Sequence, residues 1–189
     1  MARALELARK GAGRTSPNPM VGAVIIKNGR VVGEGYHKKA GFPHGEIEAL
    51  KKAGSQANGA DLYVNLEPCC HFGKTPPCTD AIIAAGIRKV IVGMSDPNKL
   101  VRGKGFRKLR QKGIEVVTGV LGQECTRLNE VFVKYICTHR PFVILKTAVS
   151  LDGKIATSSG QSQWITGAKA RQRVHQIRNE VDAIVAGAG

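Results

Sequence analysis

One histidine, one glutamate and two cysteines have the types and spacing that a hydrolytic metal site needs. His44 and Glu46 are separated by one residue, and Pro68-Cys69 precedes Cys78 along the chain. Zinc binds imidazole nitrogen and thiolate sulfur in tetrahedral geometry, and a catalytic site keeps three protein ligands and one open position. His44, Cys69 and Cys78 would supply three ligands and leave Glu46 unligated. The arrangement predicts a zinc site with a free carboxylate that transfers protons.

The order of these residues follows the zinc-deaminase signature H-x-E and then P-C-x-x-C, in which the glutamate is not a ligand. The first half matches at His44-Gly45-Glu46, whereas the second half is longer here because more residues separate Cys69 from Cys78. Zinc lowers the pKa of its water toward ~7. We expect Glu46 to take a proton from this water, pass it to a ring nitrogen and then protonate the departing ammonia.

A closed structural zinc site is the alternative to a catalytic one. In that case Cys70 or His71 would supply a fourth ligand, and the metal would stabilise the fold without chemistry. Adjacent cysteines seldom bind one ion, and Glu46 would then have no purpose, so the open site is favoured. Cys125 and Cys137 lie on an expected helix and are interpreted as core thiols.

Helices and strands alternate around these residues. The dipeptide Asn28-Gly29 is a strong hairpin signal between two β-rich runs, and a helix is expected from about His44 to Ala53. The expected strands cover residues 21–26, 31–36, 62–66, 88–93 and 115–120, and the other expected helices cover 3–10, 78–85, 103–112 and 124–137. This alternation predicts a layered α/β domain with a mixed sheet.

The segment Thr138-His-Arg-Pro141 ends the last of these helices and is the expected domain boundary, which gives domains over 1–140 and 141–189. Beyond it, strands are expected over 142–149 and 182–186, and Thr166 is expected to cap a helix. Two strands and one helix cannot enclose a core of their own. We therefore expect the second domain to be the beginning of a larger one, as in a truncated bifunctional protein.

The stretch from Glu67 to Cys78 resembles the deaminase half of the bifunctional riboflavin-biosynthesis deaminase/reductase, whose members carry P-C-x-H-x-G-x-T-P-P-C. The family usually has Ala where this chain has Gly45, and Ser where it has Cys70. The resemblance implies a cytidine-deaminase-like three-layer α/β domain, followed by the start of a dihydrofolate-reductase-like reductase domain. It covers essentially the whole chain, because it extends to Ser16-Pro-Asn-Pro-Met-Val-Gly-Ala-Val, Ser95-Asp-Pro-Asn98, Ser150-Leu-Asp-Gly-Lys-Ile-Ala156 and Gln163-Trp-Ile-Thr166.

The resemblance also implies two activities and their contacts. The deaminase would use zinc to hydrolyse an amino group from a diamino-ribosylamino-pyrimidinone 5'-phosphate. The reductase would convert the ribosyl group to ribityl with NADPH, and we expect this activity to be incomplete here. The family's substrate contacts match Asn18, His37, Lys74, Asp96, Asn98, Ser162 and Arg178, and its NADPH contacts match Ala148 and Trp164.

Charge and composition limit the other classes of function. The net charge of +15 would suit nucleic acid, but aromatic residues make up only 5% of the chain, which is poor for base stacking. Attraction of phosphorylated small molecules is therefore favoured. A nucleoside or tRNA deaminase and a non-catalytic zinc-stabilised RNA-binding module remain the alternatives.

Five cysteines suit metal binding in a reducing compartment, and no apolar run of ~18 residues is present. We expect a soluble cytoplasmic protein with no membrane partner, and leave a homo-oligomer open.

Overall fold

The structure is a computed structural model that describes residues 1–73, 76–99 and 101–187. It divides into two compact units, which are described separately below. Unit 1 spans Met1–Pro141 and unit 2 spans Phe142–Gly189. Among the described residues, no helix has both the length and the apolar composition that crossing a bilayer needs.

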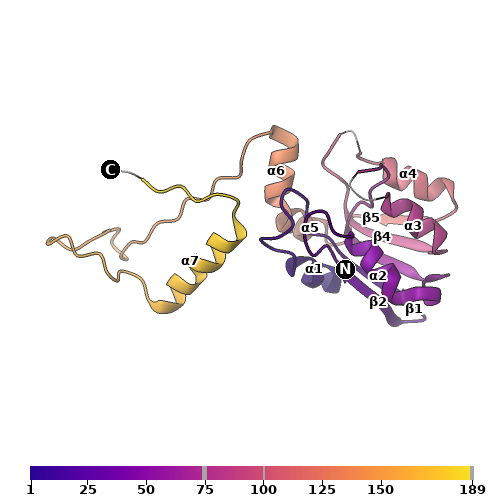
Figure 1. The fold of residues 1–189 in the computed structure, drawn as a ribbon, viewed down its shortest axis with the longest axis horizontal. Coiled ribbons are helices and arrows are strands. Elements are labelled where there is room, and N and C mark those ends of the chain that lie inside the picture. The colour runs from indigo at the N-terminus through magenta and orange to yellow at the C-terminus, as the bar shows by residue number, and fades with distance from the viewer. Residues whose placement is uncertain (74–75, 100, 188–189) are drawn as a thin grey trace. The chain divides into compact units, whose positions relative to one another are not determined.

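Unit 1 is built on one five-stranded mixed sheet with the order β2-β1-β3-β4-β5 (Figure 1). Strand β1 pairs antiparallel with β2 and β3, whereas β3 pairs parallel with β4, and β4 parallel with β5. The predicted mixed sheet is confirmed. Its strands are β1 (Gly22–Lys27), β2 (Arg30–Tyr36), β3 (Asp61–Leu66), β4 (Lys89–Met94) and β5 (Glu115–Thr118).

Helices cover both faces of this sheet (Figure 1). Helices α2, α3 and α4 pack on one face and on one another, while α1 and α5 pack on the opposite face. The predicted three-layer α/β architecture is therefore confirmed. The elements outside the sheet are α1 (Ala2–Arg9), α2 (Gly45–Ala53), the 3-10 helix η1 (Gly54–Ala57), α3 (Cys78–Ala84), α4 (Lys104–Gln111), α5 (Gly122–Leu128) and α6 (Glu130–Thr138).

Strand alternation divides the buried side chains between the two faces. Ala23 and Ile25 of β1 belong to the main core under α2, α3 and α4, whereas Val24 packs with Ala4 and Leu7 of α1. Full burial of a Val, Leu or Ile side chain contributes roughly 1.5–3 kcal/mol to the stability of the fold. Both layers are needed to bury β1, which explains why its sequence is apolar at successive positions.

Two expectations for the end of unit 1 are corrected. The single helix expected over 124–137 is two helices, α5 and α6, which meet at Asn129. The Asn129 side chain bonds the backbone of Met20 instead of continuing the helix surface. Cys125 is a buried core thiol as predicted, and burial raises its pKa to about 11. Cys137 is exposed, so its interpretation as a core thiol is wrong.

The described part of unit 2 contains one helix, α7 (Ala168–Glu180), among turns and segments without regular secondary structure. The strands expected over 142–149 and 182–186 are absent from its described residues. A strand needs a neighbour to pair with, and the described part of unit 2 offers none. Gly167 occupies the N-cap position that was expected for Thr166.

Glycines let α2 lie directly on the backbone of β2. A Cβ atom on Gly35 would collide with the backbone of Ala49 and Gly45, and one on Gly33 would collide with the Ala49 carbonyl oxygen. The same applies at the start of α2, where a Cβ atom on Gly45 would lie 2.8 Å from Val21 O. This approach places the first turn of α2, and hence Glu46, against the sheet.

We predict that Gly35→Ala lowers the free energy of unfolding by about 2 kcal/mol, because its methyl group must push the α2 backbone away from β2. Gly73→Ala is the matched control, since a Cβ atom there would meet nothing within 4 Å. Urea unfolding of both variants measures the difference. Equal stability of the two variants would show that β2 and α2 are not packed this closely.

Candidate metal centre

His44, Cys69 and Cys78 meet at one point of unit 1. His44 is the N-cap residue of α2, Cys69 follows β3, and Cys78 is the first residue of α3. His44 Nδ1 lies 3.2 Å from Cys78 Sγ and 3.6 Å from Cys69 Sγ, and the three ligand atoms lie within 4.8 Å of one another. Nitrogen and sulfur ligands of one tetrahedral zinc would lie ~3.6–3.8 Å apart. The distance from His44 to Cys69 falls in this range and the distance to Cys78 is shorter, so the three atoms are close enough together to share one zinc ion.

The backbone at the start of α3 holds Cys69 in place. The Cys78 N–H donates to Cys69 Sγ at 3.3 Å, and the Thr79 N–H donates to the Cys69 carbonyl at 3.1 Å. The side chains of Cys78 and Cys69 share a hydrogen bond, which is the largest cause that lowers the pKa of Cys69 and raises the pKa of Cys78. A hydrogen bond with Cys69 raises the pKa of His44. These hydrogen bonds favour the thiolate form of Cys69, which is the form that binds metal.

Glu46 lies beside this cluster in the first turn of α2. Its side chain is buried, with 3% of the residue exposed, and its Oε2 atom has no hydrogen-bond partner. Burial is the main reason that its pKa rises to about 7, and the nearby His44 opposes the rise. A buried polar atom without a partner is costly. Such an oxygen is suited to a reacting molecule that binds at the metal.

The described residues offer no fourth protein ligand. His44, Cys69 and Cys78 form the single cluster of potential metal ligands found there. Cys70 is half-buried and His71 is exposed, and neither belongs to the cluster. The closed structural site would need one of them, so the geometry favours an open coordination position.

Asn18 and His37 adjoin the metal ligands. The Asn18 amide nitrogen lies 3.2 Å from His37 Nε2, and His37 Nδ1 lies 3.1 Å from the carbonyl of Pro43. A carbonyl only accepts, so Nδ1 carries the proton and Nε2 accepts from Asn18. His37 is 1% exposed, burial lowers its pKa, and its ring meets that of His44 edge to face. His37 therefore orients Asn18, and its direct contact with substrate stays a prediction.

Asp96 and Asn98 lie on the loop after β4. Asp96 Oδ1 accepts a hydrogen bond from the Asn98 N–H at 2.8 Å, and both residues are half-buried. Burial is the main cause of a raised Asp96 pKa, and the charges of Glu67 and Cys69 also raise it. Asp96 is thus close to the segment that carries Glu67 and Cys69. Lys74, the expected phosphate contact, lies outside the described residues.

The expected contacts in unit 2 are exposed or half-buried. Ser162 and Arg178 are exposed, and Ala148 is half-buried. Trp164 is 69% exposed, and the guanidinium of Arg171 lies 4.4 Å from its ring centroid. Their roles in binding substrate or NADPH stay predictions.

Two buried asparagines that are not predicted from the sequence fix the segment after Asn18. Asn129 accepts from the Met20 N–H at 2.8 Å and donates to the Met20 carbonyl at 3.0 Å. Asn65 accepts from the Gly22 N–H at 2.8 Å and donates to the Met20 carbonyl at 2.9 Å. The sequence offers one local indication of these contacts, which is that Asn65 is a polar residue in a buried strand.

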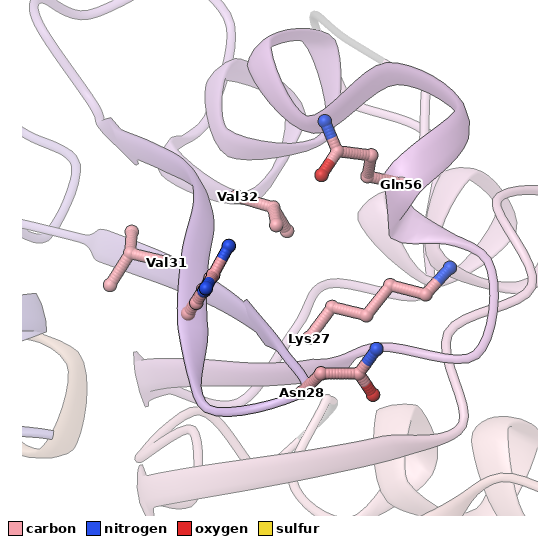
Figure 2. Close-up of a pocket in the computed structure, with 6 residues that line it drawn as sticks. Lys27, Asn28, Val31, Val32 and Gln56 are labelled. Atoms are coloured by element: carbon pink, nitrogen blue, oxygen red, sulfur yellow. The ribbon is translucent and has the colours of Figure 1, made fainter.

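A groove beside the β1–β2 hairpin shares no residue with the metal cluster. Figure 2 shows the side chains around it, including Lys27, whose ammonium group donates to the Asn58 carbonyl at 2.8 Å. No potential metal ligand or buried acid lines this groove. Its lining residues are Lys27, Asn28, Arg30, Val31, Val32 and Gln56.

We predict that Cys78→Ser abolishes the binding of zinc at the stoichiometry of one per chain, because a hydroxyl oxygen replaces one of the two thiolate ligands. Cys70→Ser, at a neighbouring cysteine outside the cluster, should retain the metal. Elemental analysis of both purified variants measures the zinc content. Loss of zinc from the Cys70 variant, or its retention by the Cys78 variant, would contradict this ligand set.

Two family models match the chain. The cytidine and deoxycytidylate deaminase zinc-binding region matches residues 1–94, and the RibD C-terminal domain matches residues 141–189. The first match includes His44, Glu46, Cys69 and Cys78, the residues that form the centre described above. A zinc-binding region is therefore supported by both the geometry and the sequence.

The matches to similar proteins cover nearly the whole chain. Riboflavin biosynthesis protein RibD of Synechocystis sp. is 57% identical over 99% of this chain and 51% of its own length. The crystal structure of a diaminohydroxyphosphoribosylaminopyrimidine deaminase/5-amino-6-(5-phosphoribosylamino)uracil reductase from Thermotoga maritima has a TM-score of 0.90 and 52% identity, and the match covers 95% of this chain and 52% of that chain. Acinetobacter baumannii RibD has a TM-score of 0.89 and 50% identity over 94% of this chain and 50% of its own. The chain spans about half the length of these relatives, and it belongs to the family of the riboflavin biosynthesis protein RibD.

Proposed function

We propose that unit 1 is a zinc-dependent deaminase of riboflavin biosynthesis. Its substrate would be a diamino-ribosylamino-pyrimidinone 5'-phosphate, from which it would release ammonia by hydrolysis. The buried Oε2 atom of Glu46, without a hydrogen-bond partner beside three potential zinc ligands, is the observation that carries this proposal. Membership of the RibD family supports the choice of substrate over a nucleoside or tRNA.

The proposed chemistry divides the work between the ligands and Glu46. When bound, zinc would lower the pKa of a water molecule toward ~7 and so supply the nucleophile. His44, Cys69 and Cys78 would hold the ion through one nitrogen and two sulfurs. Glu46 would accept the proton that the water loses and deliver it to a ring nitrogen. It would then take a second proton from the hydroxyl group that has added to the carbon and transfer it to the departing amino group, so that the C–N bond breaks and a carbonyl remains. The products would be the uracil derivative and ammonia.

Glu46 has the position and surroundings that this proton transfer requires. It does not belong to the ligand cluster, so its oxygens remain available for protons. Because it is buried, both its charged and its neutral forms are accessible near neutral pH, as its raised pKa of about 7 indicates. A carboxylate on the surface would stay ionised and would protonate a leaving group poorly.

The substrate would bind between the Asn18 and Asp96 sides of the centre. Asn18, oriented by His37, would bond a ring or ribose edge, and Asp96 would accept from ring or exocyclic amines. Asn98 would add a further contact. Lys74 is proposed to bind the phosphate as a compact positive charge.

Unit 2 is proposed to contribute to a reductase of the same pathway. We infer a deaminase domain over 1–140 and the N-terminal part of a reductase domain over 141–189, supported by the RibD C-terminal match. Ser162 and Arg178 would contact its substrate, and Ala148 and Trp164 would contact NADPH. No residue in the described part of unit 2 is buried. The described residues alone therefore do not enclose a dinucleotide.

Location and assembly remain part of this proposal. The five cysteines are free in the structure, which supports the cytoplasm as the compartment. A homo-oligomer stays a prediction.

We predict that Glu46→Gln lowers the rate of ammonia release by ~10²–10⁴-fold and leaves the zinc content unchanged, because the amide cannot act as a general base or acid near neutral pH. Glu48→Gln is the matched control, since Glu48 lies on the same helix and pairs with Lys38 at 2.9 Å outside the cluster. Steady-state ammonia release and elemental analysis measure the two effects. If the rate of Glu46→Gln stays within about tenfold of that of the unchanged protein, Glu46 does not have this role.

We also predict that the chain releases ammonia from the phosphorylated diaminopyrimidinone and not from cytidine or a tRNA anticodon stem. The reason is that this chain belongs to the RibD family, and that Cys69 and Cys78 are farther apart in the sequence than the two cysteines of the P-C-x-x-C signature. Parallel assays on one sample of known zinc content compare the three substrates. Turnover of cytidine or RNA alone would reject the proposed substrate, and no turnover at full zinc occupancy would reject the enzyme.

A further inference from the structure

The carboxylate of Glu67 is surrounded by backbone N–H groups. The residue is 3% exposed, and its Oε2 atom accepts from the N–H groups of Asp96 at 3.1 Å and Gly103 at 3.0 Å. Its Oε1 atom accepts from Gly105 at 3.0 Å and, at a longer 3.4 Å, from Phe106. These donors come from two places, the loop after β4 and the start of α4. Glu67 therefore joins the two.

Helix α4 depends on Glu67 for its N-terminal cap. The first N–H groups of a helix have no partners within the helix and need an outside acceptor. The N-cap residue of α4 is Gly103, which has no side chain to supply one, and its φ is +77°. Glu67 supplies it instead, from 36 residues earlier in the chain. An acid at this end also complements the helix dipole.

The same carboxylate holds the loop that carries the proposed substrate contacts. The Asp96 backbone is bound to Glu67, and the Asp96 side chain in turn accepts from the Asn98 N–H at 2.8 Å. The Asn98 carbonyl accepts from the N–H groups of Val101 at 2.9 Å and Arg102 at 2.8 Å. A continuous set of hydrogen bonds thus runs from Glu67 through both contacts toward α4.

Glu67 also lies two residues before the metal ligand Cys69, and this segment touches α4 directly. A Cβ atom on Gly105 would collide with the Pro68 carbonyl oxygen and would lie 3.1 Å from Glu67 Oε1. Gly105 therefore allows α4 to approach the Glu67-Pro68 backbone. The segment that carries a ligand is in this way packed against the helix that follows the substrate loop.

We propose that Glu67 is a positioning residue that sets the distance between the metal centre and the substrate loop of Asp96 and Asn98. This inference rests on the proposed deaminase function and deepens it. Glu67 does not belong to the ligand cluster, and both of its carboxylate oxygens accept from backbone N–H groups, so it acts through the backbone of the loop. Its removal would leave the metal ligands in place while the loop loses its fixed position, so substrate binding would weaken more than metal binding.

Glu67→Gln tests this with little change in shape. In either orientation of the amide, its NH₂ group faces backbone N–H donors, and those donors lose their acceptor. Gly105→Ala tests the same junction independently, because its methyl group must move α4 away from Pro68. Leu109→Ala is the control for destabilisation alone, since Leu109 is buried in α4 and takes no part in the hydrogen bonds of Glu67.

The experiment measures KM and kcat for ammonia release, zinc content, and amide hydrogen exchange on the whole chain. For Glu67→Gln and Gly105→Ala we expect KM to rise about tenfold or more, with kcat within about threefold, because the contacts that are lost bind the ground state and the transition state alike. Zinc content should not change. The amides of Asp96 and Gly103 should exchange faster relative to those of β1. Leu109→Ala should lower stability without changing KM.

Other results would overturn the inference. An unchanged KM in Glu67→Gln, or the same rise in KM in Leu109→Ala, would show a structural role only. Loss of zinc would show that Glu67 acts through Cys69 instead of the loop. If Glu67→Gln does not fold, the KM of Gly105→Ala decides. If the unchanged chain releases no ammonia, the proposed function fails, and hydrogen exchange still tests whether Glu67 holds the loop.

Discussion

The position of the Cys69 sulfur depends on the backbone at the start of α3. The Cys78 N–H donates to this sulfur at 3.3 Å, and the Thr79 N–H donates to the Cys69 carbonyl. Both ligands that follow β3 are therefore fixed by one short stretch of chain. His44, the N-cap residue of α2, then completes the cluster from a different element.

The sheet brings the remaining parts of the site to the same edge. Strands β3 and β4 are parallel neighbours, so the residues that follow them emerge side by side. Glu67 and Cys69 follow β3, and Asp96 follows β4. The metal segment and the proposed substrate loop are adjacent because of this pairing. Helix α2 supplies His44 and Glu46 to the same site. The glycines of β2 allow this, because they let the α2 backbone lie directly on the strand.

The parts of the site that are encoded locally could be predicted from the sequence. The hairpin at Asn28-Gly29 is observed, with φ of 50° and 74° at the two residues, because the turn type itself requires these residues. The spacing of His44, Cys69 and Cys78 likewise predicted a cluster that the fold brings together. In both cases residue type alone restricts the structure.

What could not be predicted depends on partners far away in the chain. Asn129 bonds Met20 across 109 residues, and Glu67 reaches Gly103 across 36, so no local pattern shows either contact. The break between α5 and α6 at Asn129 has the same origin. The strands expected in unit 2 are absent from its described residues for a related reason, because an apolar run becomes a strand only where another strand lies beside it.

The remote cap of α4 has a consequence for how unit 1 opens. An isolated helix of eight residues is marginal in water, and α4 has no acidic residue in its first turn. Its first turn is completed only while the Glu67 segment stays paired in the sheet. We therefore expect fraying of α4 and release of the loop after β3 to occur together, so that a basic surface helix and the metal-binding loop keep or lose their order as one unit.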